Sequence, residues 1–249
     1  MKKTPFILLA LTFVFSNCKK ETSCTFVYSS WTSCTNNIQT RTYTSSPSGC
    51  TGTPPADSTQ RSCVMGKIGN QIWTLTNLDV TTFRNGDAIP QVQDANAWGN
   101  LTTGAWCYYA NNTANGIIYG KLYNFYAVND PRGLAPKGYH IPTDEEWSIL
   151  TTYLGGAVAG GKLKEAGTLH WIDPNTDASN SSNFTGLPGG KRHKDGSFSG
   201  IGASGTWWSS SEISATNGAW YCYLYHDRGN IDRSNIYKLY GFSVRCIKD

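Results

Sequence analysis

Residues 137–155 read KGYHIPTDEEWSILTTYLG, and this stretch contains the clearest helix signal in the chain. Thr143, followed three residues later by Glu146, is a capping box, in which each side chain bonds to the backbone amide of the other residue. Beyond the box, three apolar residues recur at helical spacing: Trp147, Leu150 and Leu154. Gly155 then ends the predicted helix, because glycine readily takes the left-handed conformation of a helix C-terminus.

Around this helix the sequence mainly predicts short strands separated by loops. Four strands are expected, at residues 68–73, 206–210, 219–226 and 241–247. A second, shorter helix is expected at 158–166, and a long region rich in glycine, serine and asparagine follows it. One or two helices with separate groups of strands predict an α+β domain, which we place at residues 65–249.

The N-terminus has the pattern of an export signal. Lys2 and Lys3 precede an apolar run at residues 5–15, which is too short to span a bilayer, where about 20 apolar residues are needed. The run ends at Cys18 in the sequence FSNC, which resembles a bacterial lipobox. The resemblance implies removal of residues 1–17, diacylglycerol on the sulfur of Cys18, a palmitate-type acyl group on its amine, and a membrane-anchored tether at residues 18–23. The alternative is an ordinary signal peptide with a chance cysteine.

The charge distribution excludes a typical nucleic-acid binder, which concentrates Lys and Arg in a stripe or patch. Loss of Lys2 and Lys3 with the signal lowers the formal net charge from +4 to about +2, and the remaining basic residues are scattered. Charged residues make up only 15% of the chain, so neutral polar groups must solubilise most of its surface. Together with the lipobox resemblance, this composition leads us to expect a lipid-anchored protein of the bacterial outer membrane, displayed on the cell surface; the sequence does not decide between the inner and the outer leaflet.

A small module precedes the main domain at residues 24–64. It holds four of the eight cysteines of the chain: Cys24, Cys34, Cys50 and Cys63. Disulfides are the default state of cysteines in an exported protein, and a segment of this length needs such cross-links because it cannot build a core. Alternation at residues 39–43 indicates a strand, and four cysteines allow three connectivities.

The module resembles a thrombospondin type 1 repeat. The matching phrases are WTSC at 31–34, QTR at 39–41, CTG at 50–52 and QRSC at 60–63. The resemblance implies that Arg41 stacks on Trp31 by a cation–π contact, although that family often has two or three tryptophans. It also implies the disulfides Cys34–Cys63 and Cys24–Cys50. The alternative is a generic disulfide-linked spacer, and both interpretations make the module a stalk or a contact element.

Phrases throughout residues 66–249 resemble one bacterial family, the Fibrobacter succinogenes major paralogous domain. They are IGNQIWTLTNL, FRNGDAIP, AWCYYANN, YGKLYNFYAV, PKGYHIPTDEEW, GGKLKEAGTLHW, FTGLPGGKR, GTWWSSSE and YGFSVRCIKD. That family is distantly similar to the formylglycine-generating enzyme and to C-type lectins. The resemblance implies a C-type-lectin-like variant of the α+β fold, and a fold alone assigns no activity.

The sequence lacks the chemistry of those distant relatives. The oxidase holds copper between two cysteines, as soft thiolates suit Cu(I), but no Cys-x-x-x-x-Cys motif occurs here. The calcium-lectin motifs Glu-Pro-Asn and Gln-Pro-Asp do not occur either, and the four histidines lack the spacing of a zinc site. We therefore expect no catalytic residue, no metal and no cofactor.

The main domain has three cysteines, Cys107, Cys222 and Cys246, so one of them cannot form a disulfide with the other two. Cys107 and Cys246 both lie in phrases that resemble the family, which favours a Cys107–Cys246 disulfide with Cys222 as the odd thiol. A Cys222–Cys246 bond between two late strands is the alternative, and the sequence does not decide between them.

Recognition is the kind of function that these exclusions leave. Tyr221, Tyr223 and Tyr225 alternate along a predicted strand and share one of its faces. A basic, glycine-rich loop at 186–196 and a nearby tryptophan supply the candidate ligand-binding residues: Lys191, Arg192, His193 and Trp208. In the competing interpretation, Trp208 and the tyrosines fill the core and the basic residues only keep a loop solvated.

We therefore expect a surface-anchored, non-catalytic binding or adhesion lipoprotein. Its partners are the membrane, through the lipid, and a carbohydrate or a surface protein. One alternative is an enzyme or accessory factor that acts on polysaccharide, although the sequence has no paired-carboxylate motif. The other is a structural lipoprotein of the cell envelope.

Overall fold

The computed structural model describes residues 24–28, 38–40, 42–46, 60–62, 65–213 and 218–249. Several predicted features lie outside these residues: the signal peptide, Cys18, Trp31, Arg41, Cys34, Cys50 and Cys63. Cys24 is disulfide-bonded. The two pairings expected for the module remain predictions, because each of them includes a residue outside the described ranges.

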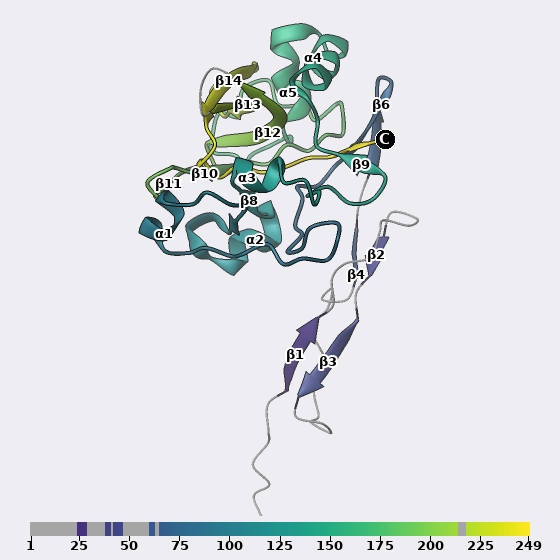
Figure 1. The fold of residues 1–249 in the computed structure, drawn as a ribbon. Helices are drawn as coiled ribbons and strands as arrows, with labels where there is room; N and C mark the ends of the chain where they lie inside the picture. The colour runs from purple at the N-terminus through teal and green to yellow at the C-terminus, as the bar shows by residue number, and fades with distance from the viewer. Residues whose placement is uncertain (1–23, 29–37, 41, 47–59, 63–64, 214–217) are drawn as a thin grey trace, which may run out of the picture.

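The strands of the small module form two antiparallel ladders. Strand β1 (Thr25–Tyr28) pairs with β3 (Tyr43–Ser46), and β2 (Ile38–Thr40) pairs with β4 (Gln60–Ser62). In Figure 1 these ladders extend away from the main body as a narrow projection. The strand expected at 39–43 is therefore wrong in its bounds, because its residues divide between β2 and β3.

The main domain contains a five-stranded sheet in the order β11-β10-β12-β13-β14, which lies on the left of the main body in Figure 1. Its strands are β10 (Gly189–Arg192), β11 (Phe198–Ile201), β12 (Ser204–Ile213), β13 (Gly218–Tyr225) and β14 (Ile231–Tyr237). Neighbours are antiparallel except β10 and β12, which are parallel. The strand predicted at 206–210 is confirmed within β12, and the strand predicted at 219–226 is confirmed in β13 except for His226, which lies in the turn after it.

A four-stranded sheet brings together the two ends of the main domain. Its order is β5 (Met65–Ile68), β6 (Gln71–Thr74), β15 (Ile247–Lys248) and β9 (Tyr139–His140). The strand expected at 68–73 is instead part of a hairpin, since the chain turns at Gly69 with a φ of +62°. A two-stranded ladder, β7 (Trp106–Cys107) and β8 (Leu122–Tyr123), completes the strands of the domain.

The strand expected at 241–247 is wrong over most of its length. Only Ile247 belongs to a strand, and the preceding residues form isolated bridges to three separate elements. Gly241 pairs with Arg192, Phe242 with Tyr123 and Ser243 with Trp207. This segment therefore runs between three elements and pairs with each of them through a single residue.

The helix predicted after Thr143 is confirmed as α4 (Asp144–Tyr153). The Thr143 hydroxyl accepts from the Glu146 amide at 3.2 Å, and the Glu146 carboxylate accepts from the Thr143 amide at 2.8 Å. Trp147 and Leu150 are buried on its inner face. Gly155 follows the helix with a φ of +112°, as expected of a glycine that ends a helix.

The other helices are short. They are α1 (Ala95–Gly99), η1 (Tyr109–Asn111), α2 (Thr113–Tyr119), α3 (Phe125–Val128), η2 (Gly156–Ala159) and α5 (Gly160–Leu163). The helix expected at 158–166 is thus η2 followed by α5, and it ends early because Lys164 is extended. None of the helices in the described ranges is long and apolar enough to cross a membrane. Helices and sheets together confirm the α+β class.

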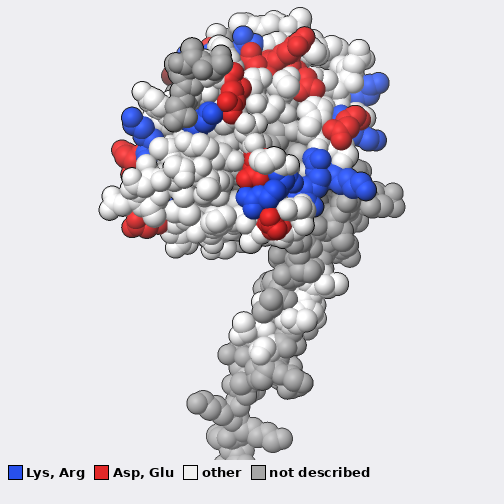
Figure 2. All heavy atoms as spheres, viewed as in Figure 1, with Lys and Arg blue, Asp and Glu red and all other residues white. Residues whose placement is uncertain are grey.

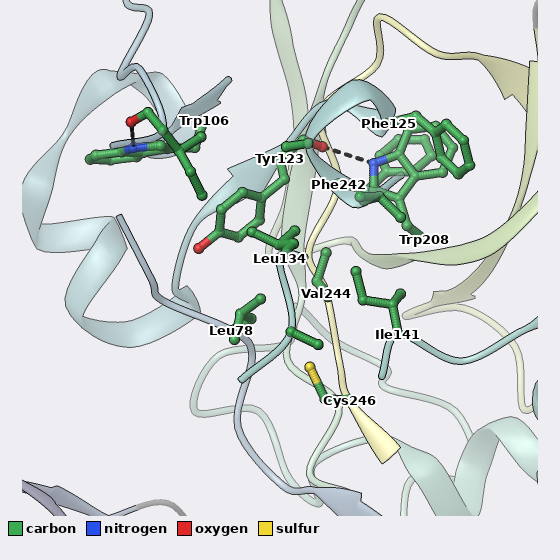
Figure 3. Close-up of a cluster of buried hydrophobic side chains, with 14 of the residues drawn as sticks. Leu78, Trp106, Tyr123, Phe125, Leu134, Ile141, Trp208, Phe242, Val244 and Cys246 are labelled. Atoms are coloured by element: carbon green, nitrogen blue, oxygen red, sulfur yellow. Dashed lines mark hydrogen bonds between the residues drawn. The ribbon is translucent and has the colours of Figure 1, made fainter. Parts of the chain in front are cut away.

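Two adjacent tryptophans of β12 point into different cores. Trp207 packs with Trp73, Trp147 and Leu224, while Trp208 packs with Phe125, Tyr123 and Phe242. Successive side chains of a strand point to opposite faces of the sheet, so β12 separates these two clusters. Figure 3 shows the second cluster, with Trp208 and Phe242 in contact at its edge.

The expected Cys107–Cys246 disulfide is wrong, and so is the alternative Cys222–Cys246. All three cysteines are free and buried. They lie in three different clusters, with Cys246 beside Val244 in the cluster of Figure 3, Cys222 beside Trp207, and Cys107 beside Leu122. Burial raises the pKa of Cys107 to about 11 and that of Cys246 to about 12, so these thiols act as apolar packing groups.

Candidate ligand-binding face

The histidines lie apart, and each is oriented by its own neighbouring oxygens. His140 contacts Glu146 and Asp249, His170 contacts Glu165, His193 contacts Ser199, and His226 contacts the carbonyl of Asp173. Within the described residues, no group of three or more His, Cys, Asp or Glu side chains is placed to hold a metal ion. The candidate site must therefore be sought among aromatic and cationic side chains.

Arg192 was expected on a ligand-binding loop, and the structure contradicts this. Its side chain is fully buried and donates to the carbonyls of Val92 at 2.6 Å, Gln93 at 2.8 Å and Gly196 at 3.1 Å. The guanidinium also lies 4.3 Å from the ring centroid of Trp98. All of these contacts are internal, so Arg192 holds the chain around residues 92–94 against β10 and is unavailable to a ligand.

Trp208 was also predicted to bind a ligand, and this prediction is wrong because its ring belongs to the core. The side chain has no exposed surface, and its indole N–H donates to the carbonyl of Tyr123 at 2.8 Å (Figure 3). Phe242 lies 4.4 Å from it and Phe125 5.3 Å, measured between ring centroids. A ring enclosed in this way cannot stack on a sugar, and the competing interpretation of Trp208 as a core residue is correct.

Lys191 and His193 remain accessible, on the opposite side of β10 from Arg192. Both are half-buried, as is Ser199, the cross-strand partner of Lys191 on β11. The imidazole Nε2 of His193 lies 2.7 Å from the Ser199 hydroxyl. Burial and the charge of Lys191 lower the pKa of His193. Lys191 and His193 therefore form one small site, which we call the cationic site; its positive charge is that of Lys191, because a lowered pKa favours the neutral imidazole of His193.

The three tyrosines of β13 lie side by side, as their alternation predicts. Ring centroids are 5.3 Å apart for Tyr221 and Tyr223, and 5.4 Å apart for Tyr223 and Tyr225. Tyr221 packs against the core through Phe242 at 4.8 Å, and burial raises its pKa to about 12. Tyr223 and Tyr225 lie further from that core, and all three rings are partly exposed.

Tyr240 joins the tyrosines to the cationic site. Its ring lies 5.4 Å from the His193 ring and 5.9 Å from Phe242, which also contacts Tyr221. We name the resulting surface the tyrosine face. It consists of six half-buried residues: Lys191, His193, Tyr221, Tyr223, Tyr225 and Tyr240. Tyr240 is the member that sequence reasoning missed, because it lies in an irregular segment without alternation.

A separate cavity of about 340 Å³ is a weaker candidate. Its charged lining residues neutralise one another, since Lys238 pairs with Glu212 at 3.0 Å and Arg132 pairs with Asp130 at 2.8 Å. A ligand would have to displace these pairs. On the side of the molecule drawn in Figure 2, basic and acidic side chains are likewise interspersed over a largely neutral surface.

The comparison with known families identifies the main domain. A model of the Fibrobacter succinogenes major domain matches residues 67–248. The chain belongs to this family. All residues of the tyrosine face lie within the matched part of this chain, whereas strands β1–β4 lie outside it. No curated protein and no solved structure matches the chain.

Proposed function

We propose that this member of the Fibrobacter succinogenes major domain family is a lipid-anchored, non-catalytic binding protein of the outer-membrane surface, and that its tyrosine face binds carbohydrate. In this proposal the main domain is C-type-lectin-like. The small module is a thrombospondin type 1-like stalk, cross-linked by Cys34–Cys63 and Cys24–Cys50. The membrane, through acylated Cys18, and a glycan are the partners.

One observation carries the carbohydrate proposal: Tyr221, Tyr223 and Tyr225 form a row of partly exposed rings at spacings of 5.3 and 5.4 Å. Aromatic rings offer an apolar face for stacking and a polar hydroxyl for hydrogen bonds. Within the described residues, the hydroxyls of Tyr223 and Tyr225 make no hydrogen bond. Rings held in a row on a sheet are also pre-organised, which limits the entropy lost on binding.

The test uses the protein without residues 1–18, applied to a glycan array of neutral and anionic saccharides. The double variant Tyr223→Ala with Tyr225→Ala should lose at least tenfold in affinity for any saccharide bound by the natural protein, as expected of about 1.4 kcal/mol or more of lost contact. Tyr153→Ala is the matched control, because this exposed tyrosine lies on α4. Full affinity in the double variant, or a comparable loss in Tyr153→Ala, would refute a binding role for the tyrosine face.

A further inference from the structure

Lys191 differs from the other buried or half-buried lysines of the main domain in having no partner. Lys121 pairs with Asp79, Lys238 pairs with Glu212, and Lys164 donates to three carbonyls. The ammonium of Lys191 makes no hydrogen bond, ion pair or ring contact with any residue that the structure describes. Burial alone lowers its pKa.

A half-buried cation without a partner loses solvation and gains nothing in return. An anionic group that arrives from solvent would restore that interaction, and in a partly buried site the attraction exceeds that at an exposed surface. Lys191 therefore has the environment of a group that awaits a ligand, whereas Lys164 and Arg192 have the environment of structural cross-links.

Among the described residues, no carboxylate forms an ion pair with Lys191. The carboxylate of Asp195 accepts from the amide and hydroxyl of Ser197, at 3.0 and 2.6 Å. Asp232, which is paired with Tyr223 across the sheet, contacts Arg228 at 3.4 Å. Neither carboxylate pairs with Lys191, so the Lys191 ammonium has no ion-pair partner among the described residues.

The cationic site continues into the aromatic row. Lys191 and His193 share one side of their chain segment, His193 contacts Tyr240, and Phe242 links Tyr240 to Tyr221 at the base of the row. A ligand that spans the face would therefore meet rings along its length and the Lys191 ammonium at one end. At the other end it would meet the Arg228 guanidinium, which lies 4.5 Å from the Tyr225 ring centroid and pairs with Asp232.

We propose that the ligand class of the tyrosine face is an anionic saccharide, with sugar rings stacked on Tyr223 and Tyr225 and a carboxylate or sulfate group paired with Lys191. This inference rests on the proposed carbohydrate-binding function and adds the charge of the ligand to it.

The experiment compares two matched pairs of probes by calorimetry with the protein without residues 1–18. One pair is oligogalacturonate and its neutral methyl ester, and the other is dextran sulfate and dextran. The anionic member of at least one pair should bind about tenfold tighter or more, as expected for a hydrogen bond to a charged group. A preference within the oligogalacturonate pair would indicate a carboxylate ligand, and a preference within the dextran pair would indicate a sulfate ligand.

Lys191→Met should abolish this preference, and Lys191→Arg should restore most of it, because the charge is retained. Lys248→Met is the control, since Lys248 is an exposed residue of the other sheet. An unchanged preference in Lys191→Met would overturn the inference. Equal binding of anionic and neutral probes, dependent on Tyr223, would overturn it and leave the proposed carbohydrate binding intact. Absence of binding to all four probes would overturn the inference as well, and the glycan array would then decide the proposed function separately.

Discussion

At the scale of single residues, Lys191 and Arg192 show how neighbours in sequence acquire opposite roles. Successive residues of β10 face opposite sides of the sheet. Arg192 faces the cluster of Trp98 and Phe198, where its planar guanidinium stacks on rings and donates to carbonyls. Lys191 faces the half-exposed side. A basic run such as KRHK therefore need not form one basic surface.

This difference predicts unequal costs for two adjacent substitutions. Arg192→Met should lower the free energy of unfolding by about 2–4 kcal/mol, because it leaves buried carbonyls without a donor. Lys191→Met should change it by no more than about 0.5 kcal/mol, since the ammonium has no partner to lose. Urea unfolding followed by tryptophan fluorescence measures both. Equal effects in the two variants would contradict the assignment of Arg192 to the core.

Other buried cations hold loops that contain few apolar residues. Arg245 donates to the carbonyls of Thr74, Phe184 and Thr185, and Lys164 donates to those of Thr176, Tyr225 and Arg228. A long cationic side chain can thereby order irregular backbone whose carbonyls would otherwise be buried without donors. The glycine- and serine-rich region between α5 and β10 owes part of its order to these two residues.

At the scale of secondary-structure elements, the start of α4 is joined to β9 and to the C-terminal residue. His140 of β9 contacts Glu146 of the capping box through Nε2 and Asp249 through Nδ1, both at 2.8 Å. Burial lowers the pKa of His140, but the hydrogen bonds with Asp249 and Glu146 outweigh burial and raise it above 6.5. The protonated imidazole is therefore the form that stabilises this junction.

The sign of the pH dependence follows from the raised pKa. The contribution of His140 to stability is fully present below its unfolded-state pKa and is lost as the pH rises through the folded-state pKa. His140→Gln should therefore lower the melting temperature more at about pH 5.5 than at about pH 8.5. Differential scanning calorimetry at the two pH values measures this.

His226→Gln is the matched control for His140, because the ring of His226 contacts a backbone carbonyl. Its effect on the melting temperature should depend less on pH. A loss in His140→Gln that is larger at high pH would show that the neutral imidazole is the stabilising form, against our assignment.

At the scale of the whole molecule, the proposed anchoring by Cys18 can be tested independently of ligand binding. Cys18→Ala removes the sulfur that would carry diacylglycerol, so the protein should leave the membrane fraction and the detergent phase, since acyl chains supply the membrane affinity. Cell fractionation with mass spectrometry of the N-terminal peptide measures both effects. Lys19→Ala serves as the control, and unchanged partitioning of Cys18→Ala would exclude the lipid anchor.

Local signals in the sequence determined a definite part of this protein. The capping box at Thr143 and Glu146, the apolar face of α4 and the ending at Gly155 depend on residues within one or two helical turns. The alternation of Tyr221, Tyr223 and Tyr225 likewise depends only on the period of a strand. These patterns were sufficient to predict the α+β class, and the sequence phrases that resemble the Fibrobacter succinogenes major domain were sufficient to predict the family.

Tertiary structure alone decided which side chains reach solvent and which partners they meet. The sequence cannot tell that Trp208 packs on Phe242, that Arg192 reaches carbonyls about one hundred residues earlier in the chain, or that three cysteines enter three separate clusters. Burial is set by what covers each face of a sheet, and the covering segments are distant in sequence. Burial therefore removes Arg192 and Trp208 from the candidate binding face and leaves the tyrosine row with Lys191 and His193 accessible.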